Sequence, residues 1–308
     1  MTPMLGIMAS QISGHLAAAV PGGYFAGGYI AAMSSNIDKL TFATEARTTL
    51  TGTLSSALGY VAGVSNNGTA GYYLGGQTNS GSVNTIDKIT FLTDAKTTIS
   101  ATLAANLIPG NNGASNSGTA GYIAGGYTTV YTSAIQKLTY STEARTTITA
   151  TLTANQGYTA GASNSGTAGY FAGGNQGPTS GIDKLTYSAD TKSTLAATLT
   201  TARYAVAGMS NSGTAAYFAG GYNAGVITGI DKVTYSTDAK TTLAATLSPG
   251  VYYAGPASNS GVAGYVAGGN NGSAIQKINY STDARTTITA TLSNSLEGPS
   301  GMANSASL

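Results

Sequence analysis

The sequence predicts an all-β protein built from six equivalent sheets, and three observations support this. A Gly-Gly pair follows an aromatic or aliphatic run six times. The residues between the pairs are rich in Thr, Val, Ile and Tyr, which favour strands over helices. The pairs also return at intervals of 48, 50, 48, 47 and 48 residues, beginning at Gly27, Gly75, Gly125, Gly173, Gly220 and Gly268. A fixed period of this size indicates a repeat architecture.

Each repeat contains four segments with the pattern of short strands. Tyr158–Ser163 leads into the turn Asn164–Gly166, whose residues tolerate positive φ, and the next strand is Tyr170–Ala172. After a variable loop comes a β-branched strand such as Ile230–Tyr235, then a polar turn such as Thr142–Arg145 and a Thr-rich strand. Four antiparallel strands in one period form one blade, so the chain is predicted to be a single six-bladed β-propeller. A β-solenoid is the alternative, but its rungs are usually shorter than this period.

The order of these segments resembles the kelch repeat over residues 21–308. The resemblance rests on an apolar strand, Gly-Gly, a variable loop, a strand with an aromatic residue, a polar turn, and Ala202-Arg203-Tyr204 in the fourth blade link. The Trp that follows the polar turn in the family is replaced here by Thr or Ser. The sequences Gly-Tyr-Phe-Ala-Gly-Gly and Ile-Asp-Lys-Leu-Thr-Tyr-Ser-Thr-Asp, and the opening Met4–Gly14, resemble structural and tail proteins of tailed bacteriophages.

The repeats begin near residues 21, 69, 119, 167, 214 and 262, and residues 1–20 precede them. The segment 297–308 matches an inner strand and the start of its Asn-Ser-Gly turn, whereas the first repeat lacks an inner strand of its own. We therefore expect the C-terminal segment to supply the innermost strand of blade one, because an unclosed ring would leave strand edges open. Residues 1–20 are expected to attach the protein to a partner through Leu5, Ile7, Ile12 and His15. Alternatively, Leu16–Val20 adds the inner strand to blade one.

Composition argues against several classes of partner. Only 8% of residues are charged and the net charge of +2 is not clustered, so no nucleic-acid partner is expected. The apolar stretch Met4–Val20 is interrupted by polar residues and glycine, so no membrane insertion is expected. The absence of Cys excludes disulfides, thiolate metal sites and a Cys nucleophile.

The sequence also lacks a recognisable catalytic set, and the prediction is a protein that is not an enzyme and has no metal or cofactor. Nearly all charges recur with the repeat, leaving Arg203 and Glu297 as exceptions, and His15 is the only His. The recurring acids Asp38, Asp87, Asp183 and Asp231 each precede a Lys, so we expect repeated ion pairs between blades rather than glycosidase-type carboxylates. The acids of the polar turns are expected to be screened by the Arg or Lys that follows them.

The two faces of the predicted ring differ. The Asn-Ser-Gly and Thr-Asp-Ala-Arg turns hardly change, whereas the second connection of each blade and the links between blades are individual. Loops of Tyr, Asn, Gly and Ser combine flat contact area with adaptable hydrogen bonds. Loop drift without function is the alternative. The candidate ligand-binding residues on this variable face are Tyr29, Gln77, Asn79, Tyr127, Tyr131, Asn175, Gln176, Tyr222, Asn223, Tyr252, Asn270 and Asn271.

The resemblance to phage proteins implies a virion protein on the tail or capsid surface. The leading expectation is a tail fibre or adhesin module that binds a host-surface receptor, for example a glycan, without bond cleavage. Residues 1–20 would contact other virion proteins, and homo-oligomerisation on the particle is left open. The alternatives are a purely structural role, as a capsid decoration or tail accessory protein, and a carbohydrate-active enzyme.

Overall fold

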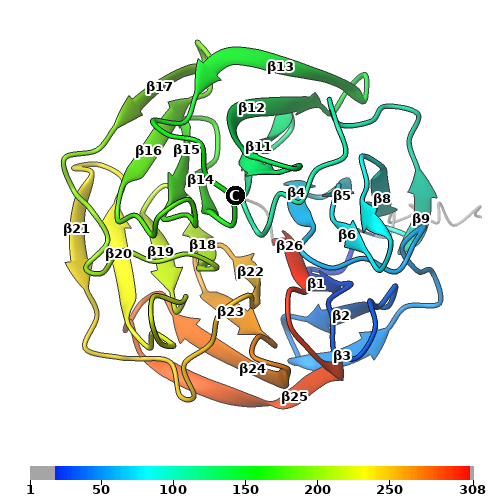
Figure 1. Cartoon of the computed structure of the whole chain (residues 1–308). Helices are drawn as coiled ribbons and strands as arrows, with labels where there is room; N and C mark the ends of the chain where they lie inside the picture. The colour runs from blue at the N-terminus through cyan, green and yellow to red at the C-terminus, as the bar shows by residue number, and fades with distance from the viewer. Residues whose placement is uncertain (1–17, 306–308) are drawn as a thin grey trace, which may run out of the picture.

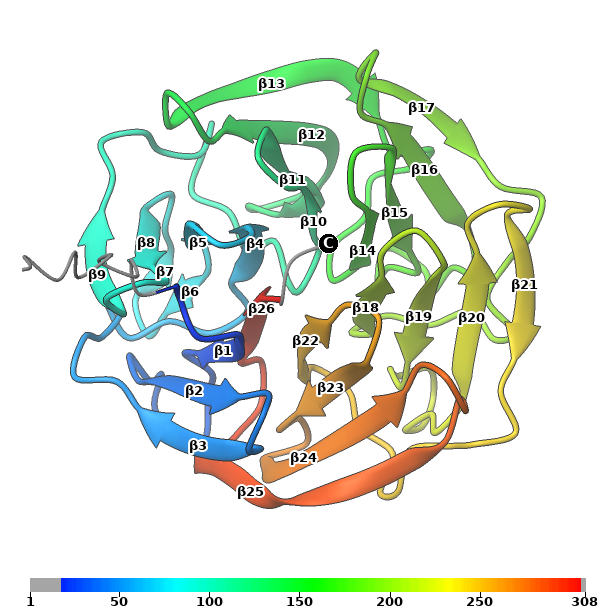
Figure 2. The same ribbon diagram turned by 180° about the vertical axis from the view of Figure 1, so that it is seen from behind.

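The computed structural model describes residues 18–305 and shows an all-β protein. Six four-stranded antiparallel sheets stand around a central axis (Figures 1 and 2), so the predicted six-bladed β-propeller is confirmed. The described residues contain no helix that is long and apolar enough to cross a membrane.

The strands follow the predicted repeat, with the first strand of each blade nearest the axis. The blades comprise, in order, β26 (Ser300–Asn304), β1 (Gly22–Ala26), β2 (Ile37–Thr41) and β3 (Ala46–Thr49); β4 (Ala62–Asn66), β5 (Ala70–Leu74), β8 (Ile86–Thr90) and β9 (Ala95–Thr98); β10 (Gly113–Asn116), β11 (Ala120–Tyr127), β12 (Tyr131–Thr139) and β13 (Ala144–Thr151); β14 (Ala160–Asn164), β15 (Ala168–Ala172), β16 (Ile182–Thr186) and β17 (Thr191–Thr194); β18 (Ala207–Asn211), β19 (Ala215–Ala219), β20 (Ile230–Thr234) and β21 (Ala239–Thr242); and β22 (Gly255–Asn259), β23 (Ala263–Ala267), β24 (Gly272–Asn279) and β25 (Arg285–Leu296). The small hairpin β6 (Gln77–Thr78) and β7 (Gly81–Ser82) belongs to the second connection of blade two.

The C-terminal strand closes the ring, as predicted. Strand β26 pairs antiparallel with β1 from Gly22 opposite Asn304 to Ala26 opposite Ser300. The N-terminal and C-terminal parts of the chain therefore share blade one (Figure 1). Because β26 occupies the inner position of that blade, the alternative in which Leu16–Val20 supplies the strand is wrong; Leu16 and Ala17 lie outside the described residues.

The hydrophobic core lies between neighbouring blades rather than at the axis. Each interface contains one pair of close aromatic rings, with centroids 4.8 to 5.4 Å apart: Tyr24–Phe91, Tyr72–Tyr140, Tyr122–Tyr187, Tyr170–Tyr235, Tyr217–Tyr280 and Phe42–Tyr265. Small residues make room for larger ones across the same interfaces. Met302 packs directly over Gly71, and Met209 packs over Gly264. Aromatic pairs of this kind add ~0.5–1.5 kcal/mol beyond their buried area.

The repeated charges hold adjacent blades together, as the sequence indicated. A Lys of the third strand of each blade donates to the turn acid of the next blade at 2.5 to 2.8 Å, in the pairs Lys39–Asp94, Lys88–Glu143, Lys137–Asp190, Lys184–Asp238, Lys232–Asp283 and Lys277–Glu45. Each Lys also lies over the ring of a Tyr whose hydroxyl donates to the same acid, for example Tyr24 to Asp94 at 2.7 Å. These repeated ion pairs and hydrogen bonds therefore stabilise the interfaces between adjacent blades.

Two details of the charge prediction are corrected. The turn acids are paired with the Lys of the neighbouring blade and not with the Arg or Lys that follows them in the chain. That following cation instead faces the buried acid of its own blade, as in Arg47 with Asp38 at 3.5 Å, so Asp38 forms its ion pair within its blade and not, as predicted, between blades. Asp38 itself accepts the backbone N–H of Ser293 at 2.7 Å, so the buried acid anchors the incoming blade link. The reason is geometric: neighbouring residues on a strand point to opposite sides of the sheet.

Candidate functional site

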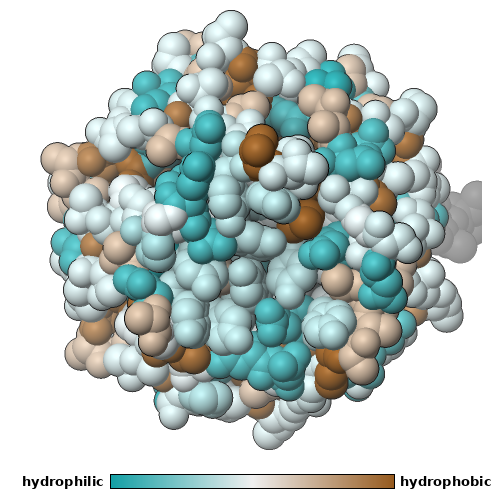
Figure 3. All heavy atoms as spheres, viewed as in Figure 1, coloured by the Kyte–Doolittle hydropathy of each residue, from teal (hydrophilic) through white to brown (hydrophobic). Residues whose placement is uncertain are grey.

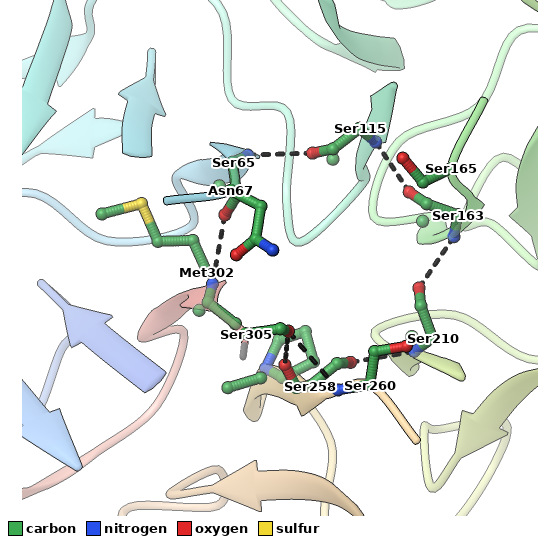
Figure 4. A pocket seen from close by; sticks show the side chains of 18 of the residues that line it. Ser65, Asn67, Ser115, Ser163, Ser165, Ser210, Ser258, Ser260, Met302 and Ser305 are labelled. Carbon is green, nitrogen blue, oxygen red and sulfur yellow. Dashed lines mark hydrogen bonds between the residues drawn. The ribbon is translucent and has the colours of Figure 1, made fainter. Parts of the chain in front are cut away.

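The central channel has a polar end beside the Asn-Ser-Gly turns. A cavity of about 120 Å³ lies there, lined by two tiers of serines around the axis (Figure 4). In the deeper tier the backbone N–H of Ser65 donates to Ser115 Oγ at 2.8 Å, and that of Ser115 donates to Ser163 Oγ at 2.6 Å. The same pattern continues around the ring, with Ala303 donating to Ser65 Oγ at 3.1 Å. Each Ser side chain thus joins two blades.

Below the serines the channel is narrowed by glycines of the inner strands. A Cβ added at Gly161, Gly113 or Gly63 would collide with a backbone carbonyl of the neighbouring inner strand. Five of the six inner strands carry glycine at this position, and the sixth carries Pro256, so the strands approach the axis closely. The serine-lined cavity therefore ends within the ring.

At the other end three tyrosines close the channel. Tyr60, Tyr158 and Tyr253 come from the links that lead into blades two, four and six, and their ring centroids are 5.1 to 5.9 Å apart. Every pair meets edge to face, at interplanar angles of 72 to 83°. Burial is the main cause that raises the pKa of Tyr158 to about 12. These phenols consequently stay neutral at physiological pH.

The remaining three links carry small residues at the equivalent position. Gly110, Ala205 and Gly298 alternate with the three tyrosines, and all six positions have φ between +51° and +79°, at values of 58, 71, 55, 55, 53 and 68° in chain order. A Cβ at Gly298 would lie 2.6 Å from the Tyr60 ring, and one at Gly110 would lie 2.9 Å from the Tyr158 Cα. The small residues are therefore required for three rings to fit around one axis.

Backbone hydrogen bonds tie these links to one another. The N–H of Gly110 donates to the carbonyl of Tyr60 at 3.0 Å, Tyr60 to Gly298 at 2.9 Å, and Gly298 to Tyr253 at 2.8 Å. Tyr253 and Ala205 continue the series at 3.0 and 2.9 Å. Residues from different blades are thereby held in a nearly continuous circle, which keeps the tyrosines in place.

The same alternation appears in the second connections of the blades. Those of blades one, three and five begin with Tyr29, Tyr127 and Tyr222, whereas those of blades two, four and six begin with Gln77, Asn175 and Asn270. Each connection lies beside the preceding blade link, as shown by the bridges of Gly59 with Gln77 and of Tyr204 with Tyr222. The six-fold ring therefore has an approximate three-fold pattern on its variable face.

The structure brings the predicted candidates together in groups. Tyr127 and Tyr131 are 5.1 Å apart, and Asn175 donates from Nδ2 to the Tyr131 hydroxyl at 3.1 Å. Tyr222 and Tyr252 meet at 5.2 Å. Tyr29 bridges the backbone of Glu297, and Asn79 accepts the N–H of Met33 at 3.4 Å. Gln77 lies in strand β6. Gln176 directly follows Asn175 in the second connection of blade four, and Asn271 has a φ of 55° in the tight turn of blade six.

Some candidate side chains are occupied by the loops themselves. Asn223 Nδ2 donates to the Ala202 carbonyl at 2.9 Å. Asn270 uses both ends of its amide, accepting from Tyr252 N–H at 3.2 Å and donating to the Gly250 carbonyl at 3.2 Å. These residues shape the loops, because their polar atoms already have partners within the protein. The attachment residues Leu5, Ile7, Ile12 and His15 lie outside the described residues.

Four further residues of the variable face were not among the candidates predicted from the sequence. Tyr60, Tyr158, Tyr204 and Tyr253 lie in the variable links and surround the axis. The variability of the links was visible in the sequence, but only a closed ring shows that tyrosines from links far apart in the sequence, such as Tyr60 and Tyr253, touch. Arg203, another link residue, is instead buried and forms an ion pair with Asp231 at 2.8 Å.

Within residues 18–305 no group of three His, Cys, Asp or Glu side chains is arranged to hold a metal ion. In the view of Figure 3 the hydrophobic residues are scattered over a mostly hydrophilic face rather than gathered in one patch. No protein-family model and no curated protein matches this sequence.

Proposed function

We propose that the propeller is a non-enzymatic recognition module that binds a surface glycan through its variable face. The observation that carries the proposal is the tyrosine cluster at the axial end of that face. Its members are Tyr204, Tyr222, Tyr252 and Tyr253, and the ring centroids of successive neighbours are 5.2 to 6.2 Å apart. Flat rings stack on the apolar faces of sugars, and amide side chains bind hydroxyl groups. The repeated scaffold of the ring holds these loops in position.

The proposal places this module on a bacteriophage particle as a tail fibre or adhesin component. Support comes from the resemblance of the repeats to kelch-like repeats of phage tail and structural proteins, and from the contrast between one uniform face and one individual face. Uniform turns such as Asn164–Gly166 contribute side chains to bonds between blades, as when Asn164 Oδ1 accepts the N–H of Gly213 at 3.0 Å.

The test is binding of the purified protein to bacterial cells and to an array of bacterial surface polysaccharides. Tyr127→Ala and Tyr222→Ala are expected to weaken binding about tenfold each, or ~1.4 kcal/mol, because each removes one stacking face. Leu92→Ser is the matched control, because Leu92 is an exposed apolar residue in a turn on the opposite face. Thermal unfolding checks that all three variants remain folded.

Two outcomes would contradict the proposal. Wild-type protein that binds neither cells nor any polysaccharide would exclude the recognition role on host surfaces. An equal loss in Leu92→Ser would move binding away from the variable face. A structural role on the particle would instead predict many copies in a fixed arrangement, with no cell binding by the free protein.

A further inference from the structure

Glu297 differs from every other acid in the protein. Among residues 18–305, which contain all the acidic residues, each Asp and Glu except Glu297 forms a salt bridge. Glu297 is also the one acid outside the repeat, in the link that leads into blade one. The equivalent positions of the other five links hold Gly59, Pro109, Gly157, Tyr204 and Tyr252. The Glu297 carboxylate therefore takes no part in the salt bridges of the described residues.

The surroundings of this carboxylate are aromatic. The Tyr60 hydroxyl donates to Glu297 Oε1 at 3.1 Å. Tyr60 meets Tyr253 edge to face at 5.1 Å, and Tyr253 meets Tyr252 in the same manner at 5.3 Å. Glu297 and the three tyrosines are all partly exposed. Burial chiefly raises the pKa of Tyr252, and the nearby charge of Glu297 raises it further.

The position of Glu297 is fixed by the backbone on both sides. Its N–H donates to the Tyr29 carbonyl at 2.8 Å, and its carbonyl accepts the Tyr29 N–H at 2.7 Å. The next residue, Gly298, donates to the Tyr253 carbonyl and accepts from Tyr60. The carboxylate is therefore carried on a rigid link beside the channel axis, which reduces the entropy lost when a ligand binds.

We propose that Glu297, Tyr60, Tyr252 and Tyr253 form a binding site for an organic ammonium group on the variable face. A carboxylate supplies the counter-charge, and the electron-rich faces of the tyrosine rings attract the cation. A divalent metal ion is a poor fit, because Ca²⁺ requires six to eight oxygen ligands and this site offers one carboxylate among phenols. The site is independent of whether the protein is an adhesin.

The test uses the full chain and simple ammonium probes in calorimetric titrations. Tetramethylammonium and choline represent quaternary groups, glucosamine represents a primary amine on a sugar, and N-acetylglucosamine is its neutral counterpart. We expect at least one of the cations to bind and the neutral sugar to bind at least tenfold more weakly. Binding by choline alone assigns a quaternary headgroup, whereas binding by glucosamine alone assigns an amino sugar.

Three variants locate the site. Glu297→Gln retains an acceptor for the Tyr60 hydroxyl but removes the charge, and we expect at least a tenfold loss of affinity. Tyr252→Leu removes a ring face while preserving an apolar side chain, and a severalfold loss is expected. Leu92→Ser, in a turn on the opposite face, is the control and should leave ammonium affinity unchanged. Thermal unfolding confirms that each variant is folded.

The proposal is overturned if no cation binds, if the neutral sugar binds as well as glucosamine, or if Glu297→Gln binds the cation with wild-type affinity. Binding to cells is measured in parallel. Ammonium binding without cell binding would support the ammonium site and contradict the adhesin function. Cell binding without ammonium binding would support the adhesin function and contradict the ammonium site.

Discussion

Removal of residues 298–308 tests whether the C-terminal strand closes the ring. The deletion removes β26, which pairs with β1 over five residue pairs. It also removes Met302, which is buried in the interface between blades one and two and packs over Gly71. Loss of a buried Met costs ~2–5 kcal/mol, and each backbone hydrogen bond lost from the ladder adds ~1 kcal/mol. The sum is comparable with the whole stability of a typical domain, ~5–15 kcal/mol.

We therefore expect the truncated chain to expose the β1 edge and either unfold or associate with other copies. Urea unfolding measures the loss of stability, light scattering measures association, and amide hydrogen exchange reports opening of β1. The point variant Met302→Ala should lose ~2–5 kcal/mol without dissociating the strand. Met209→Ala is its matched control, because Met209 packs in the same manner over Gly264 in an interface that needs no closure.

A synthetic peptide of residues 298–308, added to the truncated protein, tests the strand pairing directly. It should bind the truncated chain by adding a strand to the open edge of β1, and it should restore the exchange protection of that strand. The reasoning would be refuted if the truncated protein remained a monomer with an unchanged urea midpoint and a protected β1. In that case the pairing would contribute little to the folded ring.

Three other predictions concern the links and the interfaces. Gly110→Ala should lose ~1–3 kcal/mol in urea unfolding, because φ is 71° and the new Cβ would lie 2.9 Å from the Tyr158 Cα. Arg203→Met should lose ~3–5 kcal/mol by the same assay, because Asp231 is left without its buried ion pair. Stability should be complete below pH ~10 and fall as pH rises further, because burial raises the pKa of Tyr187 above its ordinary value in the folded state only; phenolate absorbance should appear together with unfolding.

Each of these has a control. Gly225→Ala should be nearly neutral, since a Cβ there meets no atom within 4 Å. The double variant Arg203→Met with Asp231→Asn should regain part of the lost stability, and failure to do so would argue against the buried charge as the cause. Phenolate absorbance from all tyrosines well before any unfolding would contradict the pH prediction.

The sequence predicted the strands of the fold more completely than the contacts of the side chains on the variable face. Tyr127, Tyr131 and Asn175 do lie together. Asn223 and Asn270, in contrast, use their amides inside the loops, which composition alone does not reveal. An Asn that shapes a turn and an Asn that awaits a ligand have the same local sequence, because the difference lies in which carbonyl happens to be within reach.

The sequence by itself determined the architecture. Its period specified the number of blades, its alternation specified the strands, and the unmatched C-terminal segment indicated the closing strand, because these are local patterns that repeat along the chain. Only the tertiary structure decided the axial site. Tyr60, Tyr158, Tyr253 and Glu297 lie in four different links, and they meet because ring closure brings equivalent positions of separate blades to one axis. That contact depends on the geometry of the whole ring, which no single repeat contains.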